Sequence, residues 1–334
     1  MNGQATQVHA VTHLAHADAV RRSIVSHARQ VCTDESVLDR LAVVIQEMAR
    51  NLVIHAKGGE ILFSQDPNRL ELLAVDRGPG MTDVARCLAD SYSTSGTMGA
   101  GLGAISRLSD LFDIYSQPGQ GTTVLAQFRL QATASDWLVG GICTPYPGET
   151  VSGDAWAVKG NRVMVCDGLG HGHAANAASN RACQLFLKHD LNLSLETLLE
   201  CLHRALMATR GGAVALTEVL PHQAQVRFCG MGNIAGLLHD GRSRSMVSGN
   251  GTVGYRIGKI RSFSYPWTPS TLLLLASDGI STRHDLASYS GLTMRHPAVI
   301  AAVIHRDFKR HNDDATVVVT RYAEEATHRQ HPHP

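Results

Sequence analysis

The sequence has neither an excess of one charge sign nor a long apolar segment. Its formal net charge is +1 over 334 residues, so a nucleic-acid partner is disfavoured. No apolar run approaches the ~18 residues that a membrane-spanning helix requires, and the first ten residues lack the pattern of a signal peptide. We therefore expect a cytoplasmic protein that has neither a membrane nor a nucleic-acid partner.

A cysteine framework is also missing. The seven cysteines are scattered through mostly apolar segments, and none of them forms a CxxC pair. An odd, dispersed set indicates small hydrophobic side chains in a reducing compartment rather than disulfides or a zinc site. No segment repeats at a fixed period, and the length predicts about two domains. The two halves of the chain are therefore expected to be two different folds.

The pattern of apolar residues changes near the polar junction Gln131–Ser135. Before it, a helical segment from about Asp18 precedes a long amphipathic helix (Val37 to about Ala56), which Lys57-Gly58-Gly59 is expected to end. Paired strands, short helices and a glycine-rich loop follow. After it, eight strands and three helices are expected, the helices at residues 174–189, 195–209 and 297–309. Runs of strands with helices packed on them favour an α+β class. We place the domain boundary between residues 135 and 136.

The segment Val163–His173, VMVCDGLGHGH, reads as a short buried strand that runs into Asp167-Gly168. One Asp-Gly pair is first of all a turn. The same pattern recurs at Asp154, at Asp278 and at Asp313-Asp314, each at a strand end beside small residues. Carboxylates held at strand ends, with glycine permitting a close carbonyl, suit a hard divalent cation.

In that order, GDAW, CDGLGHG, GNI, SDG and DDAT resemble the metal-dependent protein phosphatases (the PPM family), in particular the SpoIIE/RsbX type. The resemblance spans about residues 136–322 and implies an α-β-β-α sandwich. It implies phosphoserine or phosphothreonine hydrolysis with two Mn²⁺ or Mg²⁺ ions about 3.5–4 Å apart. The implied metal ligands are Asp154, Asp167, the carbonyl of Gly168, Asp278 and Asp313.

Three features of this half stay open. Asp314 is either a ligand or a group that orients its neighbour. His171 and His173 have no cysteine nearby, and an oxygen-dominated set favours Mg²⁺ or Mn²⁺ over zinc. His171 is a candidate to protonate a leaving serine oxygen, because histidine commonly acts as a general acid. The His/Pro-rich tail, residues 324–334, is expected to be disordered and non-catalytic.

In the first half, Glu47 and Asn51 lie four residues apart on the long helix, so they project from one side. From this helix alone a solvated polar face is the favoured interpretation. The loop Ser91–Gly103, SYSTSGTMGAGLG, can cradle phosphates with its amides and the following helix N-terminus, or it is a plain flexible loop. It is not a Walker loop, because no Gly-Lys-Ser/Thr follows.

Together, EMARN, DRGPGM, the glycine-rich loop and GTT resemble the GHKL ATP-binding fold, most closely the RsbT-type serine kinases, over about residues 8–130. The resemblance implies an α/β sandwich that binds ATP and Mg²⁺. Asn51 would hold Mg²⁺, and Glu47 would be the base for phosphoryl transfer. Asp76 would accept a hydrogen bond from the adenine amine, and Thr122 would support that pocket. Gly78 and Gly80 would permit the tight turn beneath the base. The phosphate lid would be formed by Gly99, Gly101 and Gly103.

The sequence thus predicts a bifunctional partner-switching regulator. Its kinase-like half would phosphorylate a STAS-domain protein or another anti-sigma or sigma regulator, and its phosphatase half would remove the phosphate. In the alternative, the first half is a non-catalytic module that senses ATP or ADP or binds a sigma or STAS partner. A further possibility is that the first half regulates the second within the same chain.

Overall fold

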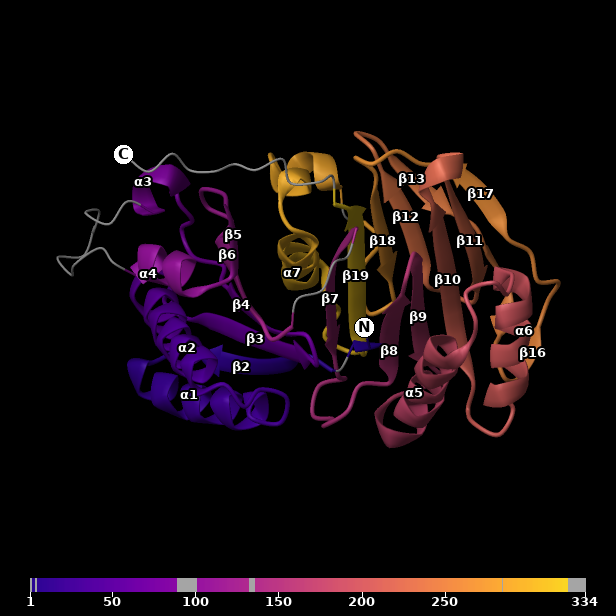
Figure 1. Cartoon of the computed structure of the whole chain (residues 1–334), viewed down its shortest axis with the longest axis horizontal. Helices are drawn as coiled ribbons and strands as arrows, with labels where there is room; N and C mark the ends of the chain where they lie inside the picture. Colours follow the sequence, from indigo (N-terminus) through magenta and orange to yellow (C-terminus); the bar gives the residue numbers. More distant parts are fainter. Residues whose placement is uncertain (1, 4, 89–100, 132–135, 284, 324–334) are drawn as a thin grey trace.

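The computed structural model describes residues 2–3, 5–88, 101–131, 136–283 and 285–323. Six layers follow one another along the longest axis of the molecule (Figure 1). Helices cover one face of a first sheet, and helix α7 (Pro297–Phe308) lies on its other face. Behind α7 come two more sheets and then the helices α5 and α6. The two-domain α+β class predicted from the sequence is confirmed.

The first half is an antiparallel sheet with strand order β2-β3-β4-β6-β5. One face is covered mainly by the helices α1 (Leu14–Ala28) and α2 (Glu35–Ala56). Two shorter helices, α3 (Val84–Leu88) and α4 (Gly101–Leu108), complete this half. The strands are β2 (Gln7–Val11), β3 (Gly59–Asp66), β4 (Arg69–Val75), β5 (Leu111–Ser116) and β6 (Thr122–Arg129).

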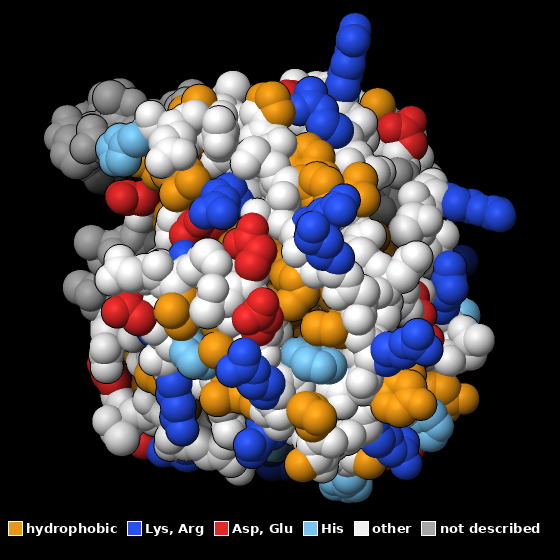
Figure 2. Space-filling model, turned by 90° about the vertical axis from the view of Figure 1, so that its right-hand side faces the viewer, with side chains coloured by type: hydrophobic (Ala, Val, Ile, Leu, Met, Phe, Trp, Pro, Cys, Tyr) orange, Lys and Arg blue, Asp and Glu red, His pale blue; other side chains and the backbone are white. Residues whose placement is uncertain are grey.

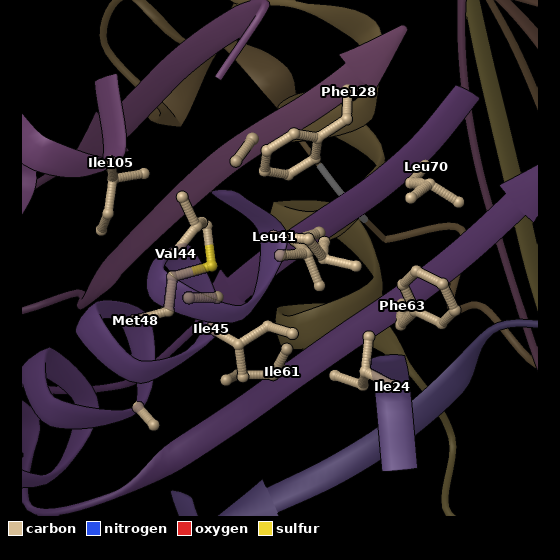
Figure 3. Packing of buried hydrophobic residues seen from close by; sticks show 14 of the residues in the cluster. Ile24, Leu41, Val44, Ile45, Met48, Ile61, Phe63, Leu70, Ile105 and Phe128 are labelled. Atoms are coloured by element: carbon tan, nitrogen blue, oxygen red, sulfur yellow. The ribbon is translucent and has the colours of Figure 1, made fainter. Parts of the chain in front are cut away.

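The strands of this sheet alternate between two cores, because successive side chains point to opposite faces. Ile61 and Phe63 pack with α1 and α2, as Figure 3 shows, whereas Leu62 points to the other face and packs with α7. On β4, Leu72 likewise packs in the core with α1 and α2, and Leu73 packs in the core with α7. Both faces of the sheet are therefore apolar, and both are covered.

The second half is a sandwich of two sheets. One sheet has the order β13-β12-β18-β19-β7, and the other has β1-β8-β9-β10-β11-β14, with β17 also paired to β11. Helices α5 (Gly172–Lys188) and α6 (Leu195–Leu206) cover the second sheet. The strands that bear on the sites below are β7 (Trp137–Thr144), β8 (Asp154–Lys159), β9 (Arg162–Gly168), β10 (Gly212–Leu220), β18 (Leu272–Ala276) and β19 (Ala315–Tyr322). The other strands are β1 (Asn2–Gly3), β11 (Gln225–Met231), β12 (Ala235–His239), β13 (Ser243–Met246), β14 (Ser248–Gly249), β15 (Gly251–Thr252), β16 (Arg256–Ile257) and β17 (Phe263–Pro266).

Helix α7 lies between the sheet of the first half and β7 and β19 of the second. Every residue from Pro297 to His305 is buried. Gly140 on β7 permits this close packing, since a Cβ there would lie 2.0 Å from the backbone nitrogen of Ala298. A helix that is apolar all round is a buried helix, and here both of its neighbours are sheets.

Several predicted boundaries need correction. The first helix begins at Leu14 rather than near residue 18. The residue that ends α2 in the left-handed conformation is Lys57 (φ 61°), not one of the glycines after it. Strand β9 extends through Asp167 to Gly168, two residues beyond the strand end expected at Cys166. The short strands β13 to β17 were not predicted, and the boundary between residues 135 and 136 stays a prediction. The tail 324–334 lies outside the described residues.

Within the described ranges, no helix combines the length and the hydropathy needed to cross a lipid bilayer.

Two buried histidines on and beside α7 predict how stability depends on pH. Burial lowers the pKa of His296 and of His305 to about 3. Their ordinary value in an unfolded chain is about 6.5, so the unfolded state binds more protons below that pH. Stability is therefore full above pH 6.5 and decreases as the pH falls toward 3.

We expect each of these histidines to lower the free energy of unfolding by about 2 kcal/mol between pH 7 and pH 5. His305→Gln can keep a hydrogen bond to Thr144, whose Oγ1 lies 2.9 Å from His305 Nε2, but it cannot titrate. Urea unfolding at both pH values should show a pH dependence about 2 kcal/mol smaller in this variant. An unchanged pH dependence would contradict the assignment.

Candidate metal centre and nucleotide site

Strand register brings two of the predicted acidic residues together. Asp154 begins β8 and Asp167 lies near the end of β9, and the two are direct partners in the antiparallel pair. Directly opposed residues project from the same face with Cβ atoms about 4.5–5.5 Å apart. Two carboxylates therefore share one end of the second sheet.

The other sheet supplies the remaining acidic residues. Asp278 follows β18, and Asp313-Asp314 precede β19, which pairs with β18. Ser277 links the two sheets, because its hydroxyl donates to Asp154 Oδ2 at 2.7 Å in the buried interior. The four strand ends predicted from the sequence thus converge at one end of the sandwich.

The electrostatics of this cluster reflect carboxylates that lie close together. Burial raises the pKa of Asp154 well above its ordinary range, and the neighbouring Asp314 and Asp278 act in the same direction. Burial, followed by the charges of Asp154 and Asp278, likewise raises the pKa of Asp167. Burial and then Asp278 raise the pKa of Asp313. Like charges forced together disfavour the ionised forms unless a cation compensates them.

Two oxygen atoms of the cluster are buried without a hydrogen-bond partner among the described residues, Asp154 Oδ1 and Asp314 Oδ2. Such atoms are costly unless something coordinates them. Glycine makes room for the second, since a Cβ on Gly153 would lie 2.6 Å from Asp314 Oδ2. An all-oxygen donor set suits Mg²⁺ or Mn²⁺, so these residues fit the divalent ions that the family resemblance implies.

No group of three His, Cys, Asp or Glu side chains within the described part of the chain is arranged to enclose one ion. The described carboxylates therefore do not enclose an ion by themselves, and carbonyl oxygens and water would have to complete its coordination sphere. The mutual effects on the pKa values show that the carboxylates share one region. We therefore treat the cluster as a candidate two-ion centre.

Sequence reasoning missed the residues that orient this cluster. The amide of Asn233 donates to Asp278 Oδ2 at 2.7 Å, and the backbone N–H of Tyr146 donates to Asp314 Oδ1 at 2.8 Å. Asn233 belongs to the GNI motif, which was a usable signal for it. Tyr146 lies in a loop without any motif.

His171 lies beside the centre and is held from two sides. Its Nδ1 is 2.9 Å from Glu149 Oε1, and its ring stacks on Tyr146 with centroids 4.5 Å apart. This leaves Nε2 directed away from the carboxylate partner. His173 is exposed.

In the first half, Glu47 and Asn51 face the N-terminal end of α4. A Cβ on Gly101, the first residue of α4, would lie 3.2 Å from both Glu47 Oε2 and Asn51 Oδ1. The amide nitrogen of Asn51 is buried and has no partner among the described residues. A carboxylate, an amide and a helix N-terminus therefore meet here, which suits phosphate groups and their cation.

Asp76 lies at the other end of α2. Its Oδ1 accepts hydrogen bonds from the backbone N–H groups of Gly78 (2.7 Å) and Thr122 (3.1 Å), while the described residues offer no donor to Oδ2. Burial is the main cause that raises the pKa of Asp76. The carboxylate is thus held in one orientation with one oxygen available to a ligand.

The glycines beside Asp76 are required by close contacts. A Cβ on Gly78 would lie 2.8 Å from Ala56, and one on Gly80 (φ +67°) would lie 2.2 Å from the carbonyl oxygen of Gln117. Glu47 and Ala56 are nine residues apart on α2, which is about 13 Å of helix. Glu47 and Asp76, which lies beside Ala56, are therefore spaced for an elongated ligand such as a nucleotide.

Of the predicted lid glycines, Gly101 and Gly103 lie in α4, and Gly103 is buried. Gly99 lies outside the described residues.

Known proteins match the two halves separately. Residues 11–128 match the histidine kinase-like ATPase domain, and residues 158–323 match stage II sporulation protein E (SpoIIE). The serine/threonine-protein kinase RsbT of Bacillus subtilis (strain 168) is 40% identical over 91 residues, which are 26% of this chain and 68% of RsbT. The chain belongs to the RsbT family of kinase-like ATPases and carries a SpoIIE-type phosphatase domain.

Solved structures extend the comparison. A chain from "The bacterial stressosome: a modular system that has been adapted to control secondary messenger signaling" has a TM-score of 0.51 at 26% identity, covering 55% of this chain and 99% of its own. RsbX in complex with magnesium has a TM-score of 0.49 at 19% identity, covering 57% and 98%. The candidate nucleotide site lies in the half that matches the ATPase domain, and the carboxylate cluster lies in the half that matches SpoIIE.

The buried carboxylate of Asp154 predicts opposite effects on stability without and with metal. In Asp154→Asn, the amide oxygen can still accept the hydrogen bond from Ser277, while the buried negative charge is removed. At pH 8 in EDTA, we expect the variant to unfold a few degrees above the wild type, because about 1 kcal/mol shifts the midpoint by about 2–4 °C.

Adding Mn²⁺ should raise the midpoint of the wild type and leave that of the variant unchanged, since a bound ion stabilises the folded state by mass action. Differential scanning fluorimetry measures both effects. An equal Mn²⁺ response in the two proteins would exclude Asp154 as a ligand.

Proposed function

We propose that the chain is a bifunctional regulator that removes phosphate from serine or threonine in a partner protein and, through its RsbT-type half, adds it. The observation that carries the hydrolase part is the convergence of Asp154, Asp167, Asp278 and Asp313 at one end of the sandwich. Asp314 joins them with one unpartnered buried oxygen.

In this proposal, Asp154, Asp167 and the carbonyl of Gly168 hold Mn²⁺ or Mg²⁺ from one sheet, and Asp278 and Asp313 hold it from the other. When bound, two such metal ions activate water near neutral pH and neutralise charge on the phosphoryl group. Ser277 and Asn233 keep Asp154 and Asp278 in place, as their hydrogen bonds indicate.

His171 would supply the proton to the serine oxygen that leaves. Glu149 holds its Nδ1 side and Tyr146 supports the ring, so Nε2 is the nitrogen available for that proton.

Exposed apolar side chains on the SpoIIE-type half, one of them next to the cluster, favour a protein substrate over a small molecule. Leu169, Met207 and Tyr255 are 57%, 65% and 82% exposed. Leu169 directly follows the proposed ligand Gly168, and its N–H donates to Gly211. Figure 2 shows the face that includes α6, where Lys and Arg side chains are interspersed with small hydrophobic groups. Apolar side chains next to basic ones suit a folded protein partner.

In the RsbT-type half, Asp76 and Thr122 would hold adenine, and Asn51 would hold Mg²⁺ against the phosphates. Glu47 would accept the proton from the serine hydroxyl that receives the phosphate. RsbT is described as a serine/threonine-protein kinase, and we extend that activity to this chain, with a STAS-domain or anti-sigma regulator as the partner. Gly78, Gly80, Gly99, Gly101 and Gly103 would shape the pocket and its lid.

Asp167→Asn should lower Mn²⁺-dependent release of phosphate from a phosphoserine protein by about 100-fold or more, because it removes one of the carboxylates that would hold the ions. Phosphate release by the purified full chain, measured over a range of Mn²⁺ concentrations, tests this. Asp190→Asn, a substitution at an exposed aspartate after α5, is the matched control and should leave the rate unchanged. Wild-type turnover in Asp167→Asn would show that the ligand assignment is wrong.

The same Asp167→Asn variant isolates the kinase reaction, since phosphate transferred to a partner would not be removed again. With labelled ATP and purified STAS-domain proteins, we expect incorporation into serine or threonine. Adding Glu47→Gln to this variant should lower the rate of phosphate incorporation by about 100-fold or more, because a general base is lost. Nucleotide binding without any transfer would instead support the non-catalytic sensing module.

A further inference from the structure

We propose that the C-terminal end of α7 couples adenine recognition in the RsbT-type half to the ligand loop of the metal centre. This inference rests on the proposed function of both sites. It assigns a structural route and a sign to regulation within the chain.

On the nucleotide side, α7 holds the backbone of the residue proposed to bind adenine. Arg306 Nη1 donates to the carbonyl oxygen of Asp76 at 3.1 Å, and the Arg306 side chain is only 5% exposed. Arg77 reaches back, with Nη1 3.1 Å from Asp307 Oδ1 and Nη2 donating to the Arg306 carbonyl. The turn that contains Asp76 and the end of α7 therefore share a set of hydrogen bonds.

On the phosphatase side, the last residue of α7 and the segment that follows it are hydrogen-bonded to the loop that carries Asp278. The N–H of Arg310 donates to the carbonyl of Gly279 at 2.8 Å, and the N–H of Ser281 donates to the carbonyl of Phe308 at 2.9 Å. Gly279 directly follows Asp278, and a Cβ there would lie 1.8 Å from the Asp314 carbonyl. A displacement of α7 at this end would therefore move the backbone next to Asp278 and Asp314 directly.

Helix α7 is stiff enough to transmit such a displacement. It is buried between two sheets, and its C-terminal end is tied to Thr144 Oγ1 by both His305 Nε2 and Lys309 Nζ at 2.9 Å. Packed elements with discrete arrangements carry coupling between sites.

The junction itself has room to rearrange. A cavity of about 330 Å³ opens beside the shared hydrogen bonds, lined by residues from both halves: Arg77, Gly119, Gln120, Tyr289, Asp307 and Phe308. We call the hydrogen bonds that join Asp76 and Arg77 to Arg306 and Asp307 the clamp. The clamp can therefore tighten or relax while the cores on either side of the helix stay packed.

The position of the clamp fixes both the ligand and the direction of the effect. Adenine on Asp76 orders the turn that Arg306 holds, which steadies α7 and the Asp278 loop, so the metal centre binds its ions more tightly. Because the contact is at the base, ATP and ADP act alike, and a guanine nucleotide does not act. A ligand that favours one arrangement shifts the other site by the same coupling free energy, commonly 5- to 150-fold.

The test measures p-nitrophenyl phosphate hydrolysis by the full chain over a range of Mn²⁺ concentrations. We expect ATP and ADP each to lower the Mn²⁺ concentration for half-maximal rate by about fivefold or more. GDP binds Mn²⁺ in solution like ADP and controls for that effect; it should change only the free Mn²⁺ concentration.

Arg306→Met and the more exposed Arg77→Ala should reduce the ADP effect to below about twofold while the rate without nucleotide stays near the wild-type value. Arg295→Met is the matched control, since it removes another ion pair between the halves, with Asp113 at 3.3 Å, just before α7 begins. It should keep the full ADP effect.

Hydrogen exchange provides a readout that does not depend on activity. ADP should slow exchange at the amides of Ile280, Ser281 and Arg310 in the wild type and not in Arg306→Met. If equilibrium dialysis shows bound ADP but neither the Mn²⁺ dependence nor the exchange changes, the coupling is wrong and the proposed activities stand. If ADP does not bind, or Mn²⁺ gives no hydrolysis at all, the proposed function fails as well.

Discussion

The pairing of β8 with β9 is the constraint on which the chemistry of this molecule depends. It sets Asp154 directly opposite Asp167, in a region where burial and neighbouring charges oppose ionisation of both. A fold optimised only for stability would not keep buried carboxylates together, since replacing such groups with neutral ones is often stabilising. The sandwich retains them at the end where Asp278 and Asp313-Asp314 also meet, which is what a cation-binding function requires.

Helix α7 makes the two halves one structure. Its side chains complete the core of the second half and also cover the face of the first sheet that carries Leu62, Leu73 and Leu125. Full burial of each such leucine contributes about 1.5–3 kcal/mol relative to exposure. The RsbT-type half is thus joined to the SpoIIE-type half by a shared apolar core, and the polar contacts of Arg306 and Arg77 lie at the edge of that core.

The sequence was sufficient for much of this arrangement. The long helix with Glu47 and Asn51, the four strand-end aspartate positions and the α+β class could be predicted, because apolar periodicity and Asp-Gly patterns are local signals. The two specific folds followed from the family resemblances. The structure places Asp154, Asp167, Asp278 and Asp313 in one region. The boundaries of the long elements were predicted to within a few residues.

The remainder depends on tertiary contacts. The GNI motif marks Asn233, but the sequence does not indicate that this residue holds the carboxylate of Asp278, 45 residues later. The short strands β13 to β17 are too polar and too brief to give a clear pattern, as the exposed segment Ser243–Ser245 shows. Helix α7 did carry a usable signal, since a helix that is apolar on every side must be covered on every side. The sequence could not say that a sheet from the other half provides the cover.

Anomalous diffraction from crystals of the full chain grown with Mn²⁺ would test the central claim most directly. The account predicts two manganese peaks about 3.5–4 Å apart, bridged by Asp154 and Asp167, with Asp278 and Asp313 contacting one of them. Manganese bound elsewhere, with these four carboxylates contacting only protein or water, would contradict it.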